Sequence, residues 1–177
     1  MPERPRKTKS RRVRPWRVLQ SPIHGRGVFA ARTIRKGETI IEYRGKRTSY
    51  EDACEGPDSD PDNPYHTFLF SLDDGRVIDA SVRGNAARWI NHSCEPNCEP
   101  IAFGDHMWIV AVRAIRPGEE LAYDYAIELD EPHTPARKRR FPCACGARRC
   151  RGSILKPKRQ PLHPLVRRAI RRYGPGR

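Results

Sequence analysis

Apolar residues along this chain come in short runs that turn-forming residues separate. Many of these runs are rich in β-branched and aromatic residues, which is typical of partly buried strands. The pattern predicts strands over residues 18–20, 28–31, 39–43, 67–72, 77–78, 100–103 and 107–114. The last four runs predict two hairpins, because Asp73-Asp74-Gly75 and Gly104-Asp105 are turn sequences between them.

Helical segments are few and short in this sequence. We expect one short helix within residues 49–54, one or two turns within residues 85–90, and a basic helix over residues 164–173. The acidic, proline-broken stretch after Tyr125, up to Pro135, predicts a linker. No repeat recurs at a fixed period. The pattern therefore predicts a mainly β fold of small sheets with few short helices.

Positive charge is concentrated at the two ends of the chain. Residues 1–17 contain eight Lys or Arg and one acid, residues 136–177 contain fifteen and no acid, and the part between has a net charge of −8. Basic ends predict non-specific binding to DNA, and solubility alone is the alternative explanation of such charge runs. The acidic middle predicts a basic protein substrate.

No apolar run approaches the length that spans a bilayer, and the basic N-terminus lacks the apolar stretch of a secretion signal. We therefore expect no membrane partner. The expected location is the cytoplasm, with nucleoid association if the source is bacterial and secretion to a host nucleus as an alternative. Six cysteines in such a chain favour metal binding or free thiols over disulfides.

Three stretches carry the chemically distinctive residues. Residues 88–98 contain Asn91-His92-Ser93, whose side chains both donate and accept hydrogen bonds and could hold a polar ligand. Residues 118–125 place two tyrosines two positions apart, and residues 143–150 supply three thiols. We expect these three stretches to form one site.

Five segments, in this order, resemble those of SET-domain protein lysine methyltransferases with a post-SET zinc motif. They are His24-Gly25-Arg26-Gly27-Val28-Phe29-Ala30, Val77-Ile78-Asp79-Ala80, residues 84–94, Glu119-Glu120-Leu121-Ala122-Tyr123-Asp124-Tyr125 and the cysteine cluster at residues 143–150. The resemblance covers residues 18–155 of the chain. It implies small β-sheets and a chain that passes through a loop near the site, which is a rare exception to un-knotted topology.

The resemblance also implies how the chain is divided. Residues 1–17 would be a basic arm that is disordered until it binds, and residues 18–130 the SET domain. Residues 131–155 would be the linker and the post-SET zinc motif, and residues 156–177 a basic tail.

The activity that the resemblance implies is transfer of a methyl group from S-adenosylmethionine to a lysine amine. Tyr125 matches the catalytic tyrosine, which would orient the amine and stabilise the transition state. Without the resemblance, a packed core tyrosine and a structural histidine are the simpler interpretations of Tyr125 and His92. The residues that match the cofactor site are His24, Gly25, Arg26, Gly27, Phe68, Asn91, His92 and Ala144.

Two positions beside the implied lysine channel bear on how many methyl groups are added. Phe68 departs from the family pattern, because close relatives often carry tyrosine there and its hydroxyl is lost. Tyr123 matches a position where the family alternates tyrosine and phenylalanine. A hydroxyl at Tyr123 holds space and a water, which favours fewer methyl groups. The two positions therefore pull the methylation state in opposite directions.

Cys143, Cys145 and Cys150 form an incomplete zinc site, because tetrahedral coordination needs a fourth ligand. The resemblance implies that Cys94 is this fourth ligand of one structural zinc. Such a site would pin the C-terminal segment, including Ala144, against the cofactor. The alternative is three reduced thiols in a flexible tail. The two remaining cysteines, Cys54 and Cys98, are expected to bind no metal.

These observations lead to one main hypothesis and two alternatives. The main hypothesis is an enzyme that methylates lysine in a basic, DNA-associated protein such as a histone or a nucleoid protein. The second is a non-catalytic nucleic-acid-binding protein on a SET scaffold. The third is a small zinc-stabilised DNA-binding module, which leaves residues 88–98 unexplained.

Overall fold

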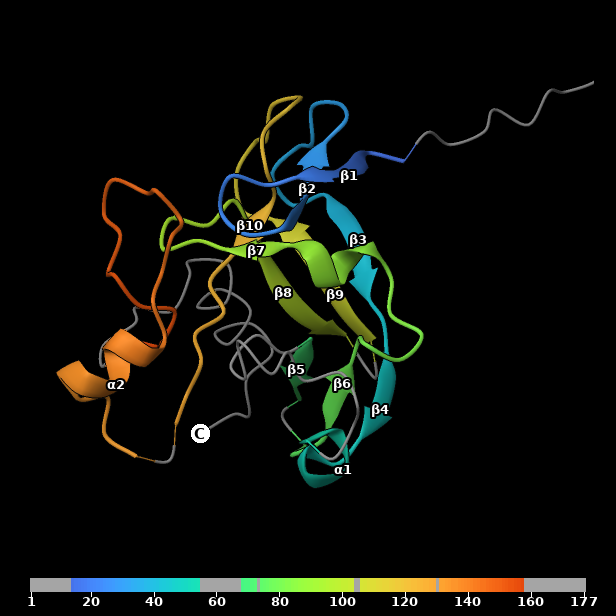
Figure 1. The fold of residues 1–177 in the computed structure, drawn as a ribbon. Coiled ribbons are helices and arrows are strands. Elements are labelled where there is room, and N and C mark those ends of the chain that lie inside the picture. The colour runs from blue at the N-terminus through green and yellow to red at the C-terminus, as the bar shows by residue number, and fades with distance from the viewer. Residues whose placement is uncertain (1–13, 55–67, 73, 104–105, 130, 158–177) are drawn as a thin grey trace, which may run out of the picture.

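The computed structural model describes residues 14–54, 68–72, 74–103, 106–129 and 131–157 of the chain (Figure 1). Its regular elements are mostly short strands. In chain order they are β1 (Trp16–Gln20), β2 (Arg26–Ala30), β3 (Thr39–Tyr43), β4 (Lys46–Thr48), α1 (Tyr50–Cys54), β5 (Leu69–Ser71), β6 (Val77–Asp79), the 3₁₀ helix η1 (Ala86–Trp89), β7 (Asn91–His92), β8 (Cys98–Phe103), β9 (His106–Ala111), β10 (Ala122–Tyr123) and α2 (Pro135–Arg140). The expected mainly β fold is confirmed.

The strands of the described residues form four small sheets. β1 and β2 make an antiparallel pair, β3, β9 and β8 make a three-stranded antiparallel sheet, and β4, β6 and β5 make another. The fourth sheet is the parallel pair of β7 and β10. Its two strands lie side by side in Figure 1 although about thirty positions of sequence separate Asn91 from Ala122.

The parallel pair joins two of the stretches that the sequence analysis selected. Asn91 lies opposite Ala122 and His92 opposite Tyr123. Beyond the strands, the Ser93 amide donates to the Tyr123 carbonyl over 3.0 Å. The Asn-His motif and the tyrosine motif are therefore one structural unit, as expected. The threaded loop that the resemblance implied stays a prediction.

The core lies between the sheets and is built from the apolar positions of the short strands. In β9, Met107, Ile109 and Ala111 are buried while the residues between them are partly exposed, which is the period of two expected for a strand with one buried face. Burial of such side chains is the main favourable contribution to folding. Ile90 and Leu121, which flank β7 and β10, are also fully buried and fix the site strands to this core.

The predicted strand positions are largely confirmed, but β4, β7 and β10 were not predicted and several strand bounds differ. β1 begins at Trp16, so the end of the predicted N-terminal arm belongs to a sheet. β9 ends at Ala111 rather than residue 114, because Val112 already bonds to the Asn97 carbonyl. The predicted linker gives way to α2, where the Thr134 side chain caps the first turn and Pro135 begins the helix. The helix predicted over residues 164–173 lies outside the described residues.

Two short segments of the chain are similar to each other, although no repeat recurs at a fixed period. Residues 32–38 and 113–119 share the pattern Arg-x-Ile-Arg-x-Gly-Glu. Gly37 and Gly118 both adopt positive φ, at 80° and 82°, and in each copy the glutamate accepts a bond from the first amide of its turn. The two copies pair through Ile34 and Ile115, whose amides each donate to the other's carbonyl over 2.9 Å. The second copy leads directly into the site strand β10.

No helix among the described residues has the length and apolar character that crossing a bilayer requires.

Candidate active site

A cavity of about 250 Å³ opens between the sheets and the C-terminal segment. One side of it, here called the core wall, consists of Ile23, His24, Asn91, His92 and Tyr125. The other side, the C-terminal wall, consists of Arg140, Phe141, Pro142, Cys143, Ala144 and Ile154. Figure 1 shows the C-terminal segment, in orange and red, to one side of β7 and β10. Six of the predicted site residues therefore line one cavity: His24, Asn91, His92, Tyr125, Cys143 and Ala144.

Asn91 is the centre of the core wall. Its buried Nδ2 lies 3.0 Å from Ser21 Oγ and 2.8 Å from Glu120 Oε1, and it also lies within 3.3 Å of the carbonyls of His24 and Arg26. The Ser21 hydroxyl donates to the same Glu120 carboxylate over 2.8 Å. This network ties three distant segments together. Asn91 thus holds the shape of the loop at residues 24–27, which is a contribution the sequence did not predict.

Gly27 has no room for a side chain at this position. A Cβ built there would lie 2.3 Å from Glu120 Oε1, which is closer than real contacts allow. Gly25, two residues earlier, has open space around it but a φ of 45°, a left-handed conformation that favours glycine. The two glycines of the loop are therefore needed for different reasons, one for close packing and the other for backbone conformation.

Within the core wall, His92 forms a hydrogen bond with the backbone of Tyr125. The buried imidazole accepts a bond at Nδ1 from the Tyr125 amide over 3.1 Å, and its Nε2 faces Cys94 Sγ at 3.4 Å. Burial lowers the pKa of His92 to about 4, although the nearby Asp124 carboxylate opposes this. The ring is neutral near pH 7, so Nδ1 is free to accept the amide proton and to orient the Tyr125 backbone.

The Tyr125 hydroxyl points back into the protein and donates to the Ile90 carbonyl over 2.9 Å. Burial raises the pKa of this phenol well above its usual range. Tyr125 is therefore a neutral hydrogen-bond donor at physiological pH rather than a phenolate. Its ring lies 5.1 Å from that of Tyr123 and 5.3 Å from that of His92. Tyr125 thus stands between the cavity and the aromatic residues behind it.

An aromatic cluster continues from Tyr125 away from the cavity. The Tyr123 ring lies 6.3 Å from Phe70, and Phe70 lies 5.3 Å from Tyr43. The Tyr43 hydroxyl donates to the Phe68 carbonyl over 3.0 Å. Tyr43 and Phe70 were not predicted to belong to the site. Phe70 could have been found from the sequence, because it follows Phe68 at the two-residue spacing that places strand residues on one face.

Phe68 does not line the cavity, and neither do Gly25, Arg26, Gly27 and Tyr123. The Phe68 ring meets Trp89 edge-on at 5.0 Å, and the Arg88 guanidinium lies over both rings. Arg26 stacks on the same Trp89 ring at 5.2 Å. Cation–π contacts of this kind stabilise by about 0.5–1 kcal/mol at exposed sites. Arg26 and Phe68 therefore both contact the Trp89 ring. Their contact with the cofactor remains a prediction.

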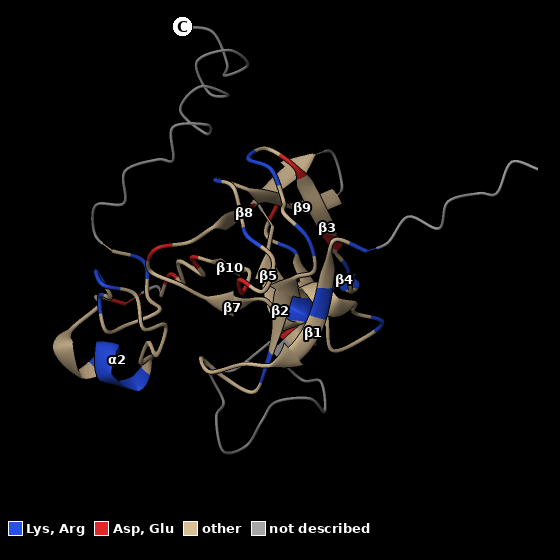
Figure 2. Cartoon of the chain, turned by 90° about the horizontal axis from the view of Figure 1, so that it is seen from above, with Lys and Arg blue, Asp and Glu red and all other residues tan. Residues whose placement is uncertain are grey.

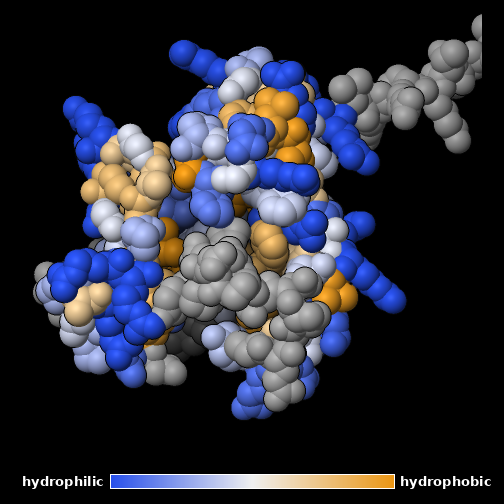
Figure 3. Space-filling view, viewed as in Figure 1, coloured by the Kyte–Doolittle hydropathy of each residue, from blue (hydrophilic) through white to orange (hydrophobic). Residues whose placement is uncertain are grey.

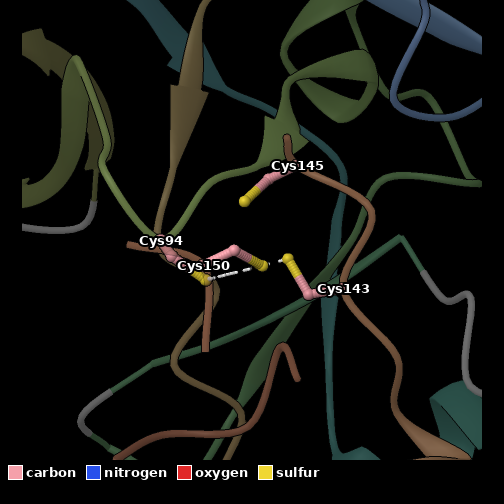
Figure 4. A group of neighbouring side chains, drawn as sticks. All are labelled: Cys94, Cys143, Cys145 and Cys150. Atoms are coloured by element: carbon pink, nitrogen blue, oxygen red, sulfur yellow. Dashed lines mark hydrogen bonds between the residues drawn. The ribbon is translucent and has the colours of Figure 1, made fainter. Parts of the chain in front are cut away.

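The four predicted zinc ligands lie together (Figure 4). The sulfur atoms of Cys94, Cys143, Cys145 and Cys150 are all within 4.8 Å of one another, with Cys94 and Cys143 at 3.7 Å. Tetrahedral zinc with bonds of about 2.3 Å requires sulfur–sulfur distances of about 3.8 Å, so this arrangement fits one such ion. In Figure 4 the four side chains converge on a common centre.

The thiol chemistry of the cluster also suits a metal ion. Burial raises the pKa of Cys94 and Cys143. At Cys145 burial acts in the same direction, but hydrogen bonds from backbone amides overcome it and lower the pKa to about 6. One thiolate is thus available near neutral pH, and a bound cation deprotonates coordinating thiols. Cys98 lies apart from the cluster and is fully buried, with its thiol directed at the Ala122 carbonyl.

The C-terminal wall is held mainly by bonds within its own segment. The Ser153 hydroxyl donates to the Phe141 carbonyl over 2.8 Å, and the Ile154 amide donates to the same carbonyl over 3.1 Å. Contact with the core comes from the thiols around Cys94, from a short pairing at Ile127, and from an ion pair between Arg151 and Asp124. Sequence analysis missed both partners of this ion pair, since pairing between distant residues leaves no local pattern.

Comparison with protein families identifies the class of protein that this fold and cavity represent. The family model described as "SET domain" matches residues 25–126, which include the loop at residues 24–27 almost entirely and both site strands. This match covers more than half of the chain. The chain therefore belongs to the SET-domain family, as the resemblance implied.

The similarity to individual relatives covers more of the chain than the match to the SET-domain model does. "Histone-lysine N-methyltransferase trithorax" of Drosophila virilis is 41% identical over 147 residues, which are 76% of this chain and 3% of that protein. "Histone-lysine N-methyltransferase 2B" of Homo sapiens is 40% identical over 147 residues, which are 76% of this chain and 5% of that protein. "Histone-lysine N-methyltransferase, H3 lysine-4 specific" of Chaetomium globosum is 36% identical over 154 residues, 81% of this chain and 14% of that protein. The chain thus spans only a small part of the length of these relatives.

Proposed function

We propose that this protein is an S-adenosylmethionine-dependent protein-lysine N-methyltransferase whose substrate is a basic, histone-like protein. The observation that carries the proposal is the cavity in which Asn91, His92 and Ala144 meet at Tyr125. These residues come from three separate parts of the chain and match the expected cofactor and catalytic positions. The relatives named as histone-lysine methyltransferases support the same activity.

The cofactor would lie between the two walls of the cavity. S-adenosylmethionine supplies an electrophilic methyl group on a sulfonium. The loop at residues 24–27, with Asn91 behind it, would hold the polar end of this molecule, and His92 and Ala144 would enclose its remainder. Phe141 is buried next to this position, so the C-terminal wall would exclude water from the methyl group.

Tyr125 would act on the lysine amine as a neutral hydrogen-bonding group. Its raised pKa keeps the proton on the phenol, and its bond to the Ile90 carbonyl fixes the orientation of the ring. The attacking amine must be uncharged and aligned with the methyl group, and a fixed phenol and carbonyl favour one orientation. The aromatic cluster of Tyr123, Phe70 and Tyr43 would surround the aliphatic part of the lysine.

The four thiols would bind one structural zinc. Zinc at this place would join Cys94 of the SET domain to the post-SET residues and so close the cavity. The proposed division of the chain follows from this: an arm at residues 1–17, a SET domain at 18–130, a post-SET segment at 131–155 and a basic tail at 156–177. A basic, histone-like substrate suits the net charge of −8 between the two basic ends and would place the protein in chromatin or an equivalent DNA-bound setting.

Binding to nucleic acid is the second candidate function, and the charge of α2 favours it. The helix carries Arg137, Lys138, Arg139 and Arg140 in its last turn. Arg137 pairs with Glu131, whereas Lys138 and Arg139 are exposed. In Figure 2 much of the helix is blue, and in Figure 3 the lower left of the molecule, where α2 lies, is strongly hydrophilic. Such cations, together with the basic ends, would contact phosphates without reading sequence.

Mass spectrometry of a histone incubated with the protein and S-adenosylmethionine tests the main proposal. Wild type should methylate lysine, and Tyr125→Phe should reduce turnover by about 100-fold or more while cofactor affinity changes little. Tyr50→Phe is the matched control, because Tyr50 lies in α1 with 60% of its surface exposed. Equal rates for wild type and Tyr125→Phe would contradict the assigned mechanism.

A binding assay separates the two candidate functions. If the second is correct, wild type binds random-sequence duplex DNA with an affinity that falls steeply with salt, and no variant methylates lysine. Deleting residues 1–15 should weaken this binding and leave cofactor binding intact. Salt-independent binding, or none at low salt, would exclude the DNA-binding function.

A further inference from the structure

Arg151 makes the least exposed ion pair between the C-terminal segment and the SET domain in the described part of the chain. Its Nη1 and Nη2 donate to the two carboxylate oxygens of Asp124 over 2.8 and 2.7 Å. This is the bidentate geometry in which guanidinium–carboxylate pairs are strongest. The Arg151 side chain is 21% exposed and that of Asp124 is 11% exposed, so solvent screens the pair only weakly.

Both partners occupy positions that matter for the cavity. Arg151 directly follows the thiol ligand Cys150, and its own amide donates to Cys94 Sγ over 3.4 Å. Asp124 directly precedes Tyr125, and its Oδ1 accepts the Ala126 amide over 3.0 Å and lies 3.5 Å from His92 Nδ1. The pair therefore spans the thiol cluster on one side and the core wall on the other.

The guanidinium has few other ways to be satisfied. Within the described residues, its buried Nε has no hydrogen-bond partner, so its directed bonds go to Asp124. A buried carboxylate that loses its cation is destabilised, because the charge remains without compensation. Loss of Arg151 should thus loosen the C-terminal wall and also disturb the carboxylate beside His92 and Tyr125.

We propose that Arg151 is a positioning residue that acts through Asp124 and locks the C-terminal wall, with its thiol cluster, onto the strand that carries Tyr125. The lock closes the cofactor cavity without touching the cofactor. It goes beyond the four thiols, since it adds a charge-based contact that zinc alone does not provide. The part of this proposal that concerns cofactor affinity rests on the proposed function, and the part that concerns the metal segment does not.

A neighbouring arginine provides a matched control. Arg149 lies two residues before Arg151 in the same segment, and its Nε is 3.9 Å from a Glu95 carboxylate oxygen. The Arg149 side chain is 77% exposed and that of Glu95 is 42% exposed. Exposed pairs of this kind contribute little to stability. Arg149→Gln and Arg151→Gln therefore remove the same charge from the same segment, but only the second breaks the lock.

The test uses the full-length, zinc-loaded protein and two measurements. The first is the rate at which zinc passes to a coloured chelator, and the second is the dissociation constant of S-adenosylmethionine by calorimetry. Arg151→Gln should speed zinc loss and weaken cofactor binding by about tenfold each, with saturated turnover largely retained. Arg151→Lys, which keeps the charge but not the bidentate geometry, should fall between, and Arg149→Gln should match wild type.

A double variant tests whether Arg151 acts through Asp124. Once Asp124→Asn has removed the buried charge, Arg151→Gln should add little further effect, because the two residues share one interaction. Fully additive effects would overturn the pairing. Zinc loss at the wild-type rate in Arg151→Gln would overturn the lock, whatever the cofactor does. Faster zinc loss with unchanged cofactor affinity would overturn its link to the cavity, whereas a wild type that binds no cofactor would refute the proposed function and leave the zinc measurement decisive.

Discussion

The two walls of the cavity are held in place by different interactions. The core wall depends on buried hydrogen bonds around Asn91 and on strands that belong to the hydrophobic core. The C-terminal wall depends on four thiols, on the ion pair between Arg151 and Asp124, on more exposed ion pairs and on a few backbone bonds at Ile127. Its α2 helix buries none of its residues. One wall of the cavity is therefore part of the folded core, and the other is a segment attached to that core.

This difference suggests how such a site can be both well formed and accessible. A wall built into the core keeps the groups around Tyr125 in a fixed arrangement, which reactions with strict alignment require. A wall attached by a cluster of thiols and by ion pairs can detach with only a local loss of free energy, since few buried apolar contacts hold it. We therefore expect perturbations of the two walls to have separable effects on stability and on cofactor binding.

Metal removal should give the largest separation between the walls. Chelation of zinc, or Cys150→Ser, should weaken S-adenosylmethionine binding by about 50-fold or more, because one side of an apolar site is lost. The strand content measured by circular dichroism should remain, since Cys94 is the only one of the four thiols that lies within the SET domain. Wild-type protein should contain about one zinc per chain by elemental analysis. If protein purified under reducing conditions with added metal contained no zinc, this result would contradict the proposed difference between the two walls.

Asn91→Ala should affect the core wall with the zinc site intact. Removing its amide takes one hydrogen-bond partner away from Ser21 and from Glu120. The free energy of unfolding should therefore fall by about 1–3 kcal/mol. Cofactor affinity should also fall, by about tenfold, while turnover at saturation changes less. Urea unfolding and calorimetry measure the two effects.

Asn97→Ala is the control for this variant. Asn97 is also buried and bonded to the backbone of Glu120 and Ala122, but it does not line the cavity. Its loss should lower stability to a similar extent and leave cofactor affinity unchanged. Equal losses of affinity in both variants would mean that Asn91 acts only through global stability.

Substitution of Gly25 and of Gly27 tests how tightly their loop packs beside the core wall. Gly27→Ala should destabilise the protein by about 1–3 kcal/mol, because its Cβ would collide with the Glu120 carboxylate. Gly25→Ala meets no neighbour and should cost only about 1 kcal/mol from its left-handed backbone. Thermal unfolding of both variants gives the comparison. The reverse order would show that the Glu120 carboxylate moves aside readily.

The smallest effects on rate are expected behind Tyr125, where the core wall meets the aromatic cluster. Tyr123→Phe should shift the product toward higher methylation, since removal of the hydroxyl enlarges the space around the amine. Phe68→Tyr should alter the ratio of mono-, di- and trimethyl lysine as well. Mass spectrometry of one substrate lysine over time measures these ratios. An unchanged ratio in both variants would remove these residues from the lysine channel.

Much of this protein was determined by the sequence alone. Turn residues and β-branched runs located most strands, because strand geometry depends on local sterics and on a two-residue period. The spacing of Cys143, Cys145 and Cys150 indicated a metal site, since ligands close in sequence are also close in space. Tyr125, Asn91 and His92 were found because family resemblance preserves short motifs.

Only the tertiary structure decided how these pieces are joined. The parallel pairing of β7 with β10, the carboxylate of Glu120 beneath Gly27 and the ion pair between Arg151 and Asp124 all connect residues that lie far apart in the chain. α2 was likewise not predicted, because a helix of six residues, four of them charged, has no apolar period. Side-chain partners over such separations follow from how the sheets pack, and no local pattern in the sequence records that packing.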